Sequence, residues 1–209
     1  MSRALIVAIV LTGVLAGVAA AHFFRRADDG VPQLERAVLF REPRPLPDAE
    51  LAGPRGVRFG TTSLAGHWTF IFFGFVNCPD ICPTTLATLA AVEESLSDLP
   101  PATRPAVAFV SVDPGRDTPE VLAQYVAHFD ASFAGVTGSA AAIVAWTRAL
   151  GVAVIIGAPS SDGSYSVDHS AAIFLVDPDA RAAALFGTPH EAGAIARDYR
   201  RIVAARKSG

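Results

Sequence analysis

The two cysteines of the chain lie close together and define one candidate site. Cys78 and Cys82 are its only cysteines, in a Cys-x-x-x-Cys motif that follows an apolar run and is closed by Pro83. If this spacing is helical, it rises about 6 Å, which lies within the Cα separation that a disulfide tolerates. The pair can therefore exist as a disulfide, as a dithiol or as a metal-bound dithiolate. Two buried structural cysteines are the alternative, but pairs beside helix starts are usually reactive.

The residues around the motif predict how its thiols behave. Pro83 suits the first position of a helix, which places Cys82 at or beside the N-cap. There the thiolate would face free amide donors and the positive end of the helix dipole, so we expect it to be stabilised. Asp80, between the two thiols, acts in the opposite direction because it raises thiol pKa values. Soft thiolates favour Cu(I) or zinc, and an additional imidazole fits either metal.

One of five histidines is the best candidate for that imidazole. For four of them a surface or helix-capping role is the better interpretation: His22, His67, His128 and His190. His169 differs because it leads directly into a predicted buried strand, where loop residues are held by rigid structure. Its alternative is a strand-edge histidine that is hydrogen-bonded to Asp168 or to backbone. Asp80 and Asp168 could act near a metal, or they could be solvated turn residues.

Composition limits the class of protein. The 209 residues give room for one domain and a tail. The charge is nearly balanced, with 17 Lys+Arg against 20 Asp+Glu, and the arginines are scattered among acidic residues. We therefore expect no nucleic-acid partner.

The amino-terminal part predicts export from the cytoplasm. Residues 4–21 are uncharged and almost wholly apolar, which is about the length of a membrane span, so residues 1–24 are predicted to be a membrane anchor or a signal segment. Residues 19–21 could serve a signal peptidase, although the apolar run is longer than an ordinary signal core. Either outcome places the rest of the chain in an oxidising environment. Residues 25–44 are rich in proline and charge and predict a tether to a domain over residues 45–209.

The domain is predicted to alternate strands and helices. The expected strands are 59–64, 68–75, 106–112, 152–156, 171–176 and 181–186, and the expected helices follow Pro83 and span 117–129, 139–150 and 191–205. Asp117 is the predicted N-cap of its helix, because Glu120 stands three residues on. Asp113, Arg116 and Asp117 are assigned to turn and cap formation, with partner recognition as the alternative. This succession predicts an α/β domain with a parallel component, followed by an antiparallel hairpin and a closing helix. It is compatible with a thioredoxin-like mixed central sheet flanked by helices, which an N-terminal transmembrane helix would precede.

Three motifs, in order along the chain, resemble the Sco/SenC family of copper chaperones. They are residues 73–86, residues 111–114 with 116–120, and residues 167–170 with 177–178. The resemblance covers roughly residues 45–205. It implies a thioredoxin-like, usually membrane-anchored domain that binds one copper ion, as Cu(I) or Cu(II), through Cys78, Cys82 and His169.

The resemblance also implies a function and partners. Such a protein delivers copper to the binuclear copper site in subunit II of cytochrome c oxidase, or reduces the cysteines of that site. A copper donor and a thiol reductant would be further partners, and in a bacterium the domain would lie at the periplasmic face of the inner membrane. Two alternatives stay open: a metal-independent thiol-disulfide reductase with Cys78 and Cys82 as its catalytic redox pair, and a copper or redox sensor. His169 discriminates between them, because dithiol exchange can proceed without a distant imidazole.

Overall fold

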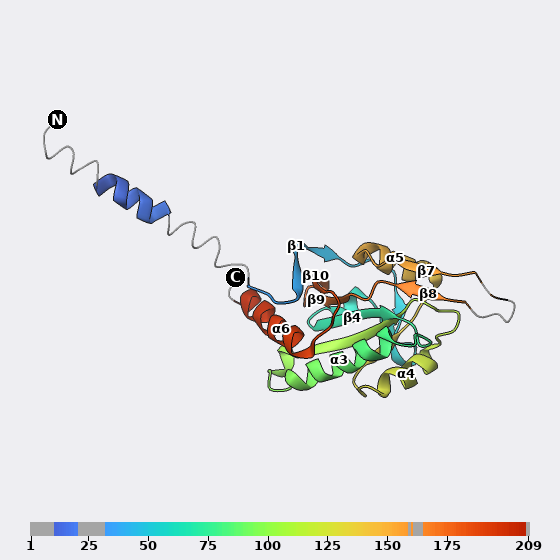
Figure 1. The fold of residues 1–209 in the computed structure, drawn as a ribbon. Helices are drawn as coiled ribbons and strands as arrows, with labels where there is room; N and C mark the ends of the chain where they lie inside the picture. Colours follow the sequence, from blue (N-terminus) through green and yellow to red (C-terminus); the bar gives the residue numbers. More distant parts are fainter. Residues whose placement is uncertain (1–10, 21–31, 159, 161–164, 208–209) are drawn as a thin grey trace, which may run out of the picture. The chain divides into compact units, whose positions relative to one another are not determined.

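The computed structural model describes residues 11–20, 32–158, 160 and 165–207. Residues 11–20 are helical (Figure 1), while residues 1–10 and 21–24 of the predicted membrane segment lie outside the described residues. In the described part of the chain, no helix combines the length and the apolar character that a membrane crossing requires. Glu35–Tyr199 forms one compact unit, which contains the central sheet. Met1–Leu34 and Arg200–Gly209 are assigned to a second unit.

A six-stranded mixed sheet is the centre of the larger unit. Its strand order is β1 (Ala37–Pro45), β10 (Arg181–Phe186), β9 (Ile173–Val176), β4 (Trp68–Gly74), β5 (Pro105–Ser111) and β6 (Ala134–Val136). β4, β5 and β6 run parallel, whereas the other neighbours pair antiparallel. The predicted combination of a parallel part with a closing hairpin is therefore confirmed. Two small antiparallel sheets pair β2 (Leu51–Ala52) with β3 (Arg58–Phe59) and β7 (Val154–Ile156) with β8 (Val167–His169).

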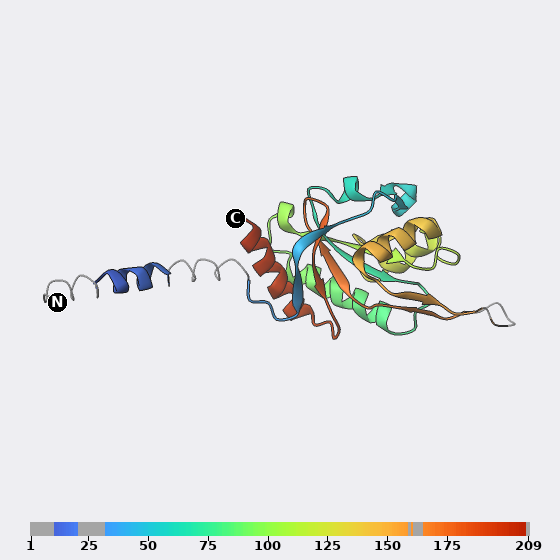
Figure 2. The same cartoon turned by 90° about the horizontal axis from the view of Figure 1, so that it is seen from above.

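Helices cover both faces of the central sheet. They are α2 (Thr61–Leu64), α3 (Ile81–Ser95), α4 (Pro119–Ala127), α5 (Ala140–Leu150) and α6 (Ala192–Lys207), with 3-10 turns η1 (Pro54–Gly56) and η2 (Pro101–Thr103). α3 and α6 lie on one side of the sheet and α5 lies on the other (Figures 1 and 2). The strand predicted over residues 59–64 is wrong beyond Phe59, because residues 61–64 form α2 instead.

The central strand β4 carries the core and leads into the cysteine motif. All seven of its residues are buried, as the continuous apolar run predicted. On one face, the Tyr199 ring of α6 packs 5.9 Å from Trp68 and 5.4 Å from Phe70, measured between ring centroids. At its carboxyl end the strand reaches Gly74 and the loop that holds Cys78. The rigid centre of the sheet therefore positions the loop that carries Cys78.

The predicted tether is partly a strand. Residues 37–44 of the predicted tether lie within β1, which pairs antiparallel with β10 at the edge of the sheet. Pro43 and Pro45 are compatible with this position because an edge strand has one side that needs no ladder hydrogen bonds. Proline is unfavourable inside a helix, but it does not exclude an edge strand.

A buried carboxylate secures the entry to β1. Asp198 of α6 accepts the backbone N–H groups of Glu35 at 2.8 Å, Arg36 at 2.7 Å and Ala37 at 2.9 Å. Its side chain is fully buried. The folded unit therefore begins near Glu35, about ten residues before the predicted boundary.

Candidate metal centre

Cys82 lies inside the first turn of α3. The helix begins at Ile81, with Asp80 at the N-cap position, so Cys82 is the second helical residue and Pro83 the third. This corrects the predicted register, in which Pro83 would be the first helical residue. Cys78 lies in the loop before the helix, where its N–H donates to the Phe75 carbonyl at 3.2 Å. Both thiols are free and buried.

A glycine at the end of β4 makes room for the Cys82 thiol. A Cβ atom built on Gly74 would lie 2.7 Å from Cys82 Sγ and 2.5 Å from the Phe109 ring. Those distances are far below ordinary van der Waals contact, so a side chain at this position would displace the sulfur. Gly74 is therefore part of the site, because the backbone of β4 must approach the thiol closely.

His169 reaches the thiols from the opposite side. It ends β8, and its Nε2 atom lies 3.4 Å from Cys82 Sγ. Its Nδ1 atom lies 3.0 Å from the Ser170 carbonyl. A carbonyl only accepts hydrogen bonds, so Nδ1 carries the proton and the Nε2 lone pair faces the sulfur. This is the orientation in which an imidazole binds a metal, with its other nitrogen held by a carbonyl. Of the two hydrogen-bond partners that the alternative interpretation named, the backbone carbonyl is the one that His169 contacts, while Asp168 is exposed.

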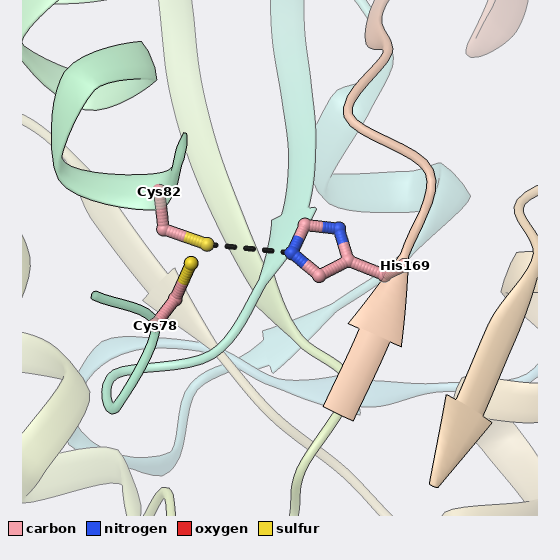
Figure 3. A group of neighbouring side chains, drawn as sticks. All are labelled: Cys78, Cys82 and His169. Carbon is pink, nitrogen blue, oxygen red and sulfur yellow. Dashed lines mark hydrogen bonds between the residues drawn. The ribbon is translucent and has the colours of Figure 1, made fainter. Parts of the chain in front are cut away.

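The three candidate ligand atoms converge on one point. Cys78 Sγ, Cys82 Sγ and His169 Nε2 lie within 4.8 Å of one another, and Figure 3 shows the three side chains pointing toward each other from separate elements. Metal–sulfur bonds of about 2.3 Å and metal–nitrogen bonds of about 2.0 Å would need only a small contraction of this group. The structure thus brings together all three predicted site residues.

Burial sets the protonation of the site. Burial raises the pKa of the Cys82 thiol well above its ordinary value, and its closeness to Cys78 adds to this rise. A backbone hydrogen bond involving Phe75 opposes the rise. The expected thiolate stabilisation at the helix start is therefore wrong for the metal-free protein. Burial also lowers the pKa of His169, which keeps the imidazole neutral at pH 7. A bound cation would replace the thiol protons.

A shallow cavity gives access to the site. It has a volume of about 280 Å³ and is lined by Phe75, Cys78, Pro79, Asp80, Ile81, Val167, Asp168 and His169. Cys82 is absent from this lining and is fully buried. A partner that enters the cavity therefore meets Cys78 and His169 first. Asp80 and Asp168 are both exposed at its rim.

The other histidines take different roles. His67 and His128 are exposed and contact the carbonyls of Ala65 and Gln124, as a surface role predicts. His22 lies outside the described residues. His190 was predicted to cap the last helix or lie on the surface, but its Nδ1 atom lies 3.1 Å from Thr85 Oγ1, beside the site.

His190 and His169 flank the same aromatic ring. Ring centroids lie 6.0 Å apart between Phe72 and His169 and 6.4 Å apart between Phe72 and His190. Burial lowers the pKa of His190. No local signal in the sequence identifies this position, because it depends on how α3 packs beside the start of α6.

The fold and the site together define a class of protein. A thioredoxin-like α/β domain with a thiol pair at a helix start and an imidazole facing it is a thiol-based metal or redox protein. The family model described as SCO1/SenC matches residues 47–204, and the chain belongs to this family.

Individual relatives agree with this assignment. The chain is 36% identical over 163 residues to the protein SCO2 homolog, mitochondrial, of Homo sapiens, which covers 77% of this chain and 60% of the human protein. The crystal structure of Arabidopsis thaliana ScoI with copper bound is 30% identical, with a TM-score of 0.69 over 80% of this chain and 99% of that one. The solution structure of apo Sco1 from Thermus thermophilus is 33% identical, with a TM-score of 0.72 over 82% of this chain and 98% of that one.

Proposed function

We propose that this chain is a copper chaperone that binds one copper ion through Cys78, Cys82 and His169. The observation that carries the proposal is the convergence of the three ligand atoms within 4.8 Å. Two thiolates and one imidazole suit Cu(I), and the imidazole is also compatible with Cu(II). Met1 is the only methionine, so a thioether-rich copper site is excluded. The copper-bound relative from Arabidopsis thaliana supports the choice of metal.

The three proposed ligands have different roles in copper binding and release. Cys82 is buried and holds the ion from inside the domain, while Cys78 and His169 border the cavity. An acceptor ligand therefore reaches copper from the side of Cys78 and His169. Neutral His169 offers its Nε2 lone pair without first losing a proton, because burial lowers its pKa. Each thiol must lose its proton when copper binds, so binding tightens as the pH rises.

The family resemblance supplies the proposed destination. The acceptor is the binuclear copper site in subunit II of cytochrome c oxidase, to which this chain delivers copper or whose cysteines it reduces. A copper donor and a thiol reductant act before it. Residues 1–24 anchor the chain in a membrane, and the folded domain lies outside the cytoplasm, where the dithiol needs that reductant.

A metal-independent thiol-disulfide reductase is the second candidate. It is favoured by the two free thiols at and just before the start of α3, of which Cys78 borders the cavity. In this case Cys78 attacks the substrate disulfide and Cys82 resolves the mixed disulfide, so that both electrons come from the thiol pair. The reductase needs no imidazole opposite the thiols, whereas the copper site does.

The deciding experiment is an anaerobic Cu(I) titration of the reduced full-length protein against a chelator of known affinity. We expect one equivalent per chain, with tight binding lost in Cys78→Ser and Cys82→Ser and weakened in His169→Ala. His67→Ala is the matched control, because it removes an exposed histidine. Undiminished copper binding in Cys82→Ser would contradict the proposal and leave the reductase as the better account.

A further inference from the structure

The loop between β5 and α4 contacts both sides of the proposed metal site. Residues 112–118 form this loop, and they contribute no candidate ligand. Two of its carboxylates are almost completely buried, with Asp113 2% exposed and Asp117 1% exposed. Buried carboxylates are costly unless they accept hydrogen bonds, so their partners show what the loop holds.

Asp117 holds the loop that carries the first cysteine. Its Oδ2 atom accepts the Val76 N–H at 3.1 Å and the Ser111 hydroxyl at 2.6 Å. The Ser111 oxygen in turn accepts the Asp113 N–H at 3.0 Å. Val76 stands two residues before Cys78. The predicted N-cap role of Asp117 is therefore wrong: Thr118 caps α4, with its hydroxyl oxygen 3.3 Å from the Val121 nitrogen.

Asp113 and Arg116 hold the segment that carries the histidine. The Tyr165 hydroxyl donates to Asp113 Oδ1 at 2.5 Å, and Arg116 forms an ion pair with the same carboxylate. The Arg116 guanidinium also lies 3.8 Å from the centroid of the Tyr165 ring, and its Nη1 atom is 3.4 Å from the Tyr165 carbonyl. Tyr165 stands four residues before His169. One aromatic side chain is thus bound by a carboxylate and covered by a cation.

The β7–β8 hairpin needs such an attachment. It forms its own two-stranded sheet, separate from the six-stranded one. An isolated two-stranded hairpin is marginally stable in water. Ile155 and Ile156 of β7 are 65% and 56% exposed, so this strand of the hairpin is largely not packed against a core. The His169 ring does pack against Phe75, with ring centroids 5.9 Å apart, but that contact is at the end of β8.

We infer that the β5–α4 loop is a positioning clamp that sets the distance between the thiols and the imidazole. Asp117 fixes the approach to Cys78, while Asp113 and Arg116 fix the approach to His169 through Tyr165. The inference rests on the proposed function for its consequence in copper binding, but the clamp itself is a property of the metal-free protein. Tyr165 and Arg116 are positioning residues, because they act on copper only through His169.

The first test needs no copper. Amide hydrogen exchange of the metal-free full chain would compare the wild type with Tyr165→Phe, which removes one hydroxyl, and Arg116→Lys, which keeps the charge but loses the planar stack. We expect faster exchange at residues 165–170 in both variants, with unchanged exchange in β4 and β5. Tyr125→Phe is the matched control, because the Tyr125 hydroxyl has no hydrogen-bond partner among the residues that the structure describes. Unchanged exchange at residues 165–170 would overturn the clamp, whatever the protein does with copper.

The second test is a double-mutant cycle on Cu(I) affinity. Tyr165→Phe should weaken Cu(I) binding by about tenfold, the lower end of the effect of losing a hydrogen bond to a charged group. In the His169→Ala background the same substitution should have no effect, because the residue that it positions is gone. An equal loss in both backgrounds would mean that Tyr165 acts on the whole domain, and this would overturn the inference. Failure of the wild type to bind copper would instead overturn the proposed function and leave the exchange result standing.

Discussion

Cys82 Sγ and His169 Nε2 lie 3.4 Å apart although 87 residues separate them along the chain. The contact joins the start of α3 to the end of β8, two elements that belong to different parts of the fold. The imidazole is oriented by the Ser170 carbonyl and packs against Phe75 and Phe72. Because the thiols and the imidazole come from separate elements, substitutions can test the contribution of each separately.

Replacing His169 with alanine should separate copper binding from disulfide formation. We expect Cu(I) affinity to fall by more than roughly tenfold, since even residues that only orient a metal ligand typically contribute 10–100-fold. The disulfide between Cys78 and Cys82 should still form, because both thiols are untouched. Competition against a Cu(I) chelator and thiol counting after mild oxidation would measure the two properties. Loss of both properties together would identify His169 as a structural residue.

Gly74→Ala should disturb the site through packing alone. The added methyl group would stand 2.7 Å from Cys82 Sγ and 2.5 Å from the Phe109 ring, so α3 or the ring must move. Overpacking of this kind costs about 1–3 kcal/mol in the free energy of unfolding. Urea unfolding would measure that loss, and Cu(I) competition would show the displaced thiol. The matched control is Gly187→Ala, where an added Cβ meets nothing within 4 Å. Equal stabilities of the two variants would contradict the close approach.

Strand β1 should decide where the stable domain begins. A chain that starts at residue 32 keeps β1 and the three amide groups bound by Asp198, whereas a chain that starts at residue 46 loses both. The shorter chain also leaves the buried Asp198 carboxylate without these donors, at a cost of several kcal/mol. Circular dichroism and urea titration should show a cooperative transition for the longer chain and a much weaker one for the shorter. If both chains unfold at the same urea concentration, β1 is dispensable.

Local sequence patterns predict some features of this fold and site but not others. Buried strand β4 and the pair of Cys78 and Cys82 follow from local patterns, because apolar runs and short spacings are local. β1 does not, because the partner that makes it a strand is β10, near the other end of the chain. The protonation of Cys82 was also mispredicted, since the helix start is a local signal whereas burial depends on the packing around the thiol. His190 and Tyr165 were missed for the same reason.

The stability of the metal-free protein should fall as the pH is lowered through about 6.5. Burial lowers the pKa values of His190 and His169, so the folded state resists protonation that the unfolded state accepts near pH 6.5. Their contribution to stability is present above pH 6.5 and is lost as the pH falls. His190→Gln removes one of the two histidines that the unfolded state protonates more readily than the folded state. The loss of stability at low pH should therefore be smaller in this variant. Urea unfolding at several pH values would measure this loss of stability. His128→Gln is the control, because His128 is exposed. An identical pH dependence in wild type and His190→Gln would contradict the burial effect.

Copper should raise the reduction potential of the thiol pair. Cu(I) binds the dithiol and not the disulfide, so it stabilises the reduced form by mass action. At a free Cu(I) concentration of about 100 times Kd the stabilisation is about 2.7 kcal/mol, which corresponds to roughly 60 mV for a two-electron couple. Titration against a thiol redox buffer, with and without buffered Cu(I), would follow the disulfide fraction by mass. A midpoint that copper does not move would favour the metal-independent reductase.

The order of the ligands along the chain has a consequence for biogenesis. During synthesis both thiols emerge long before His169, and strands β9 and β10 of the central sheet follow the hairpin that carries His169. A nascent chain therefore offers copper a two-coordinate dithiol that lacks its imidazole. The proposed three-ligand site exists only in the finished domain, so complete loading of the metal would report that folding has ended.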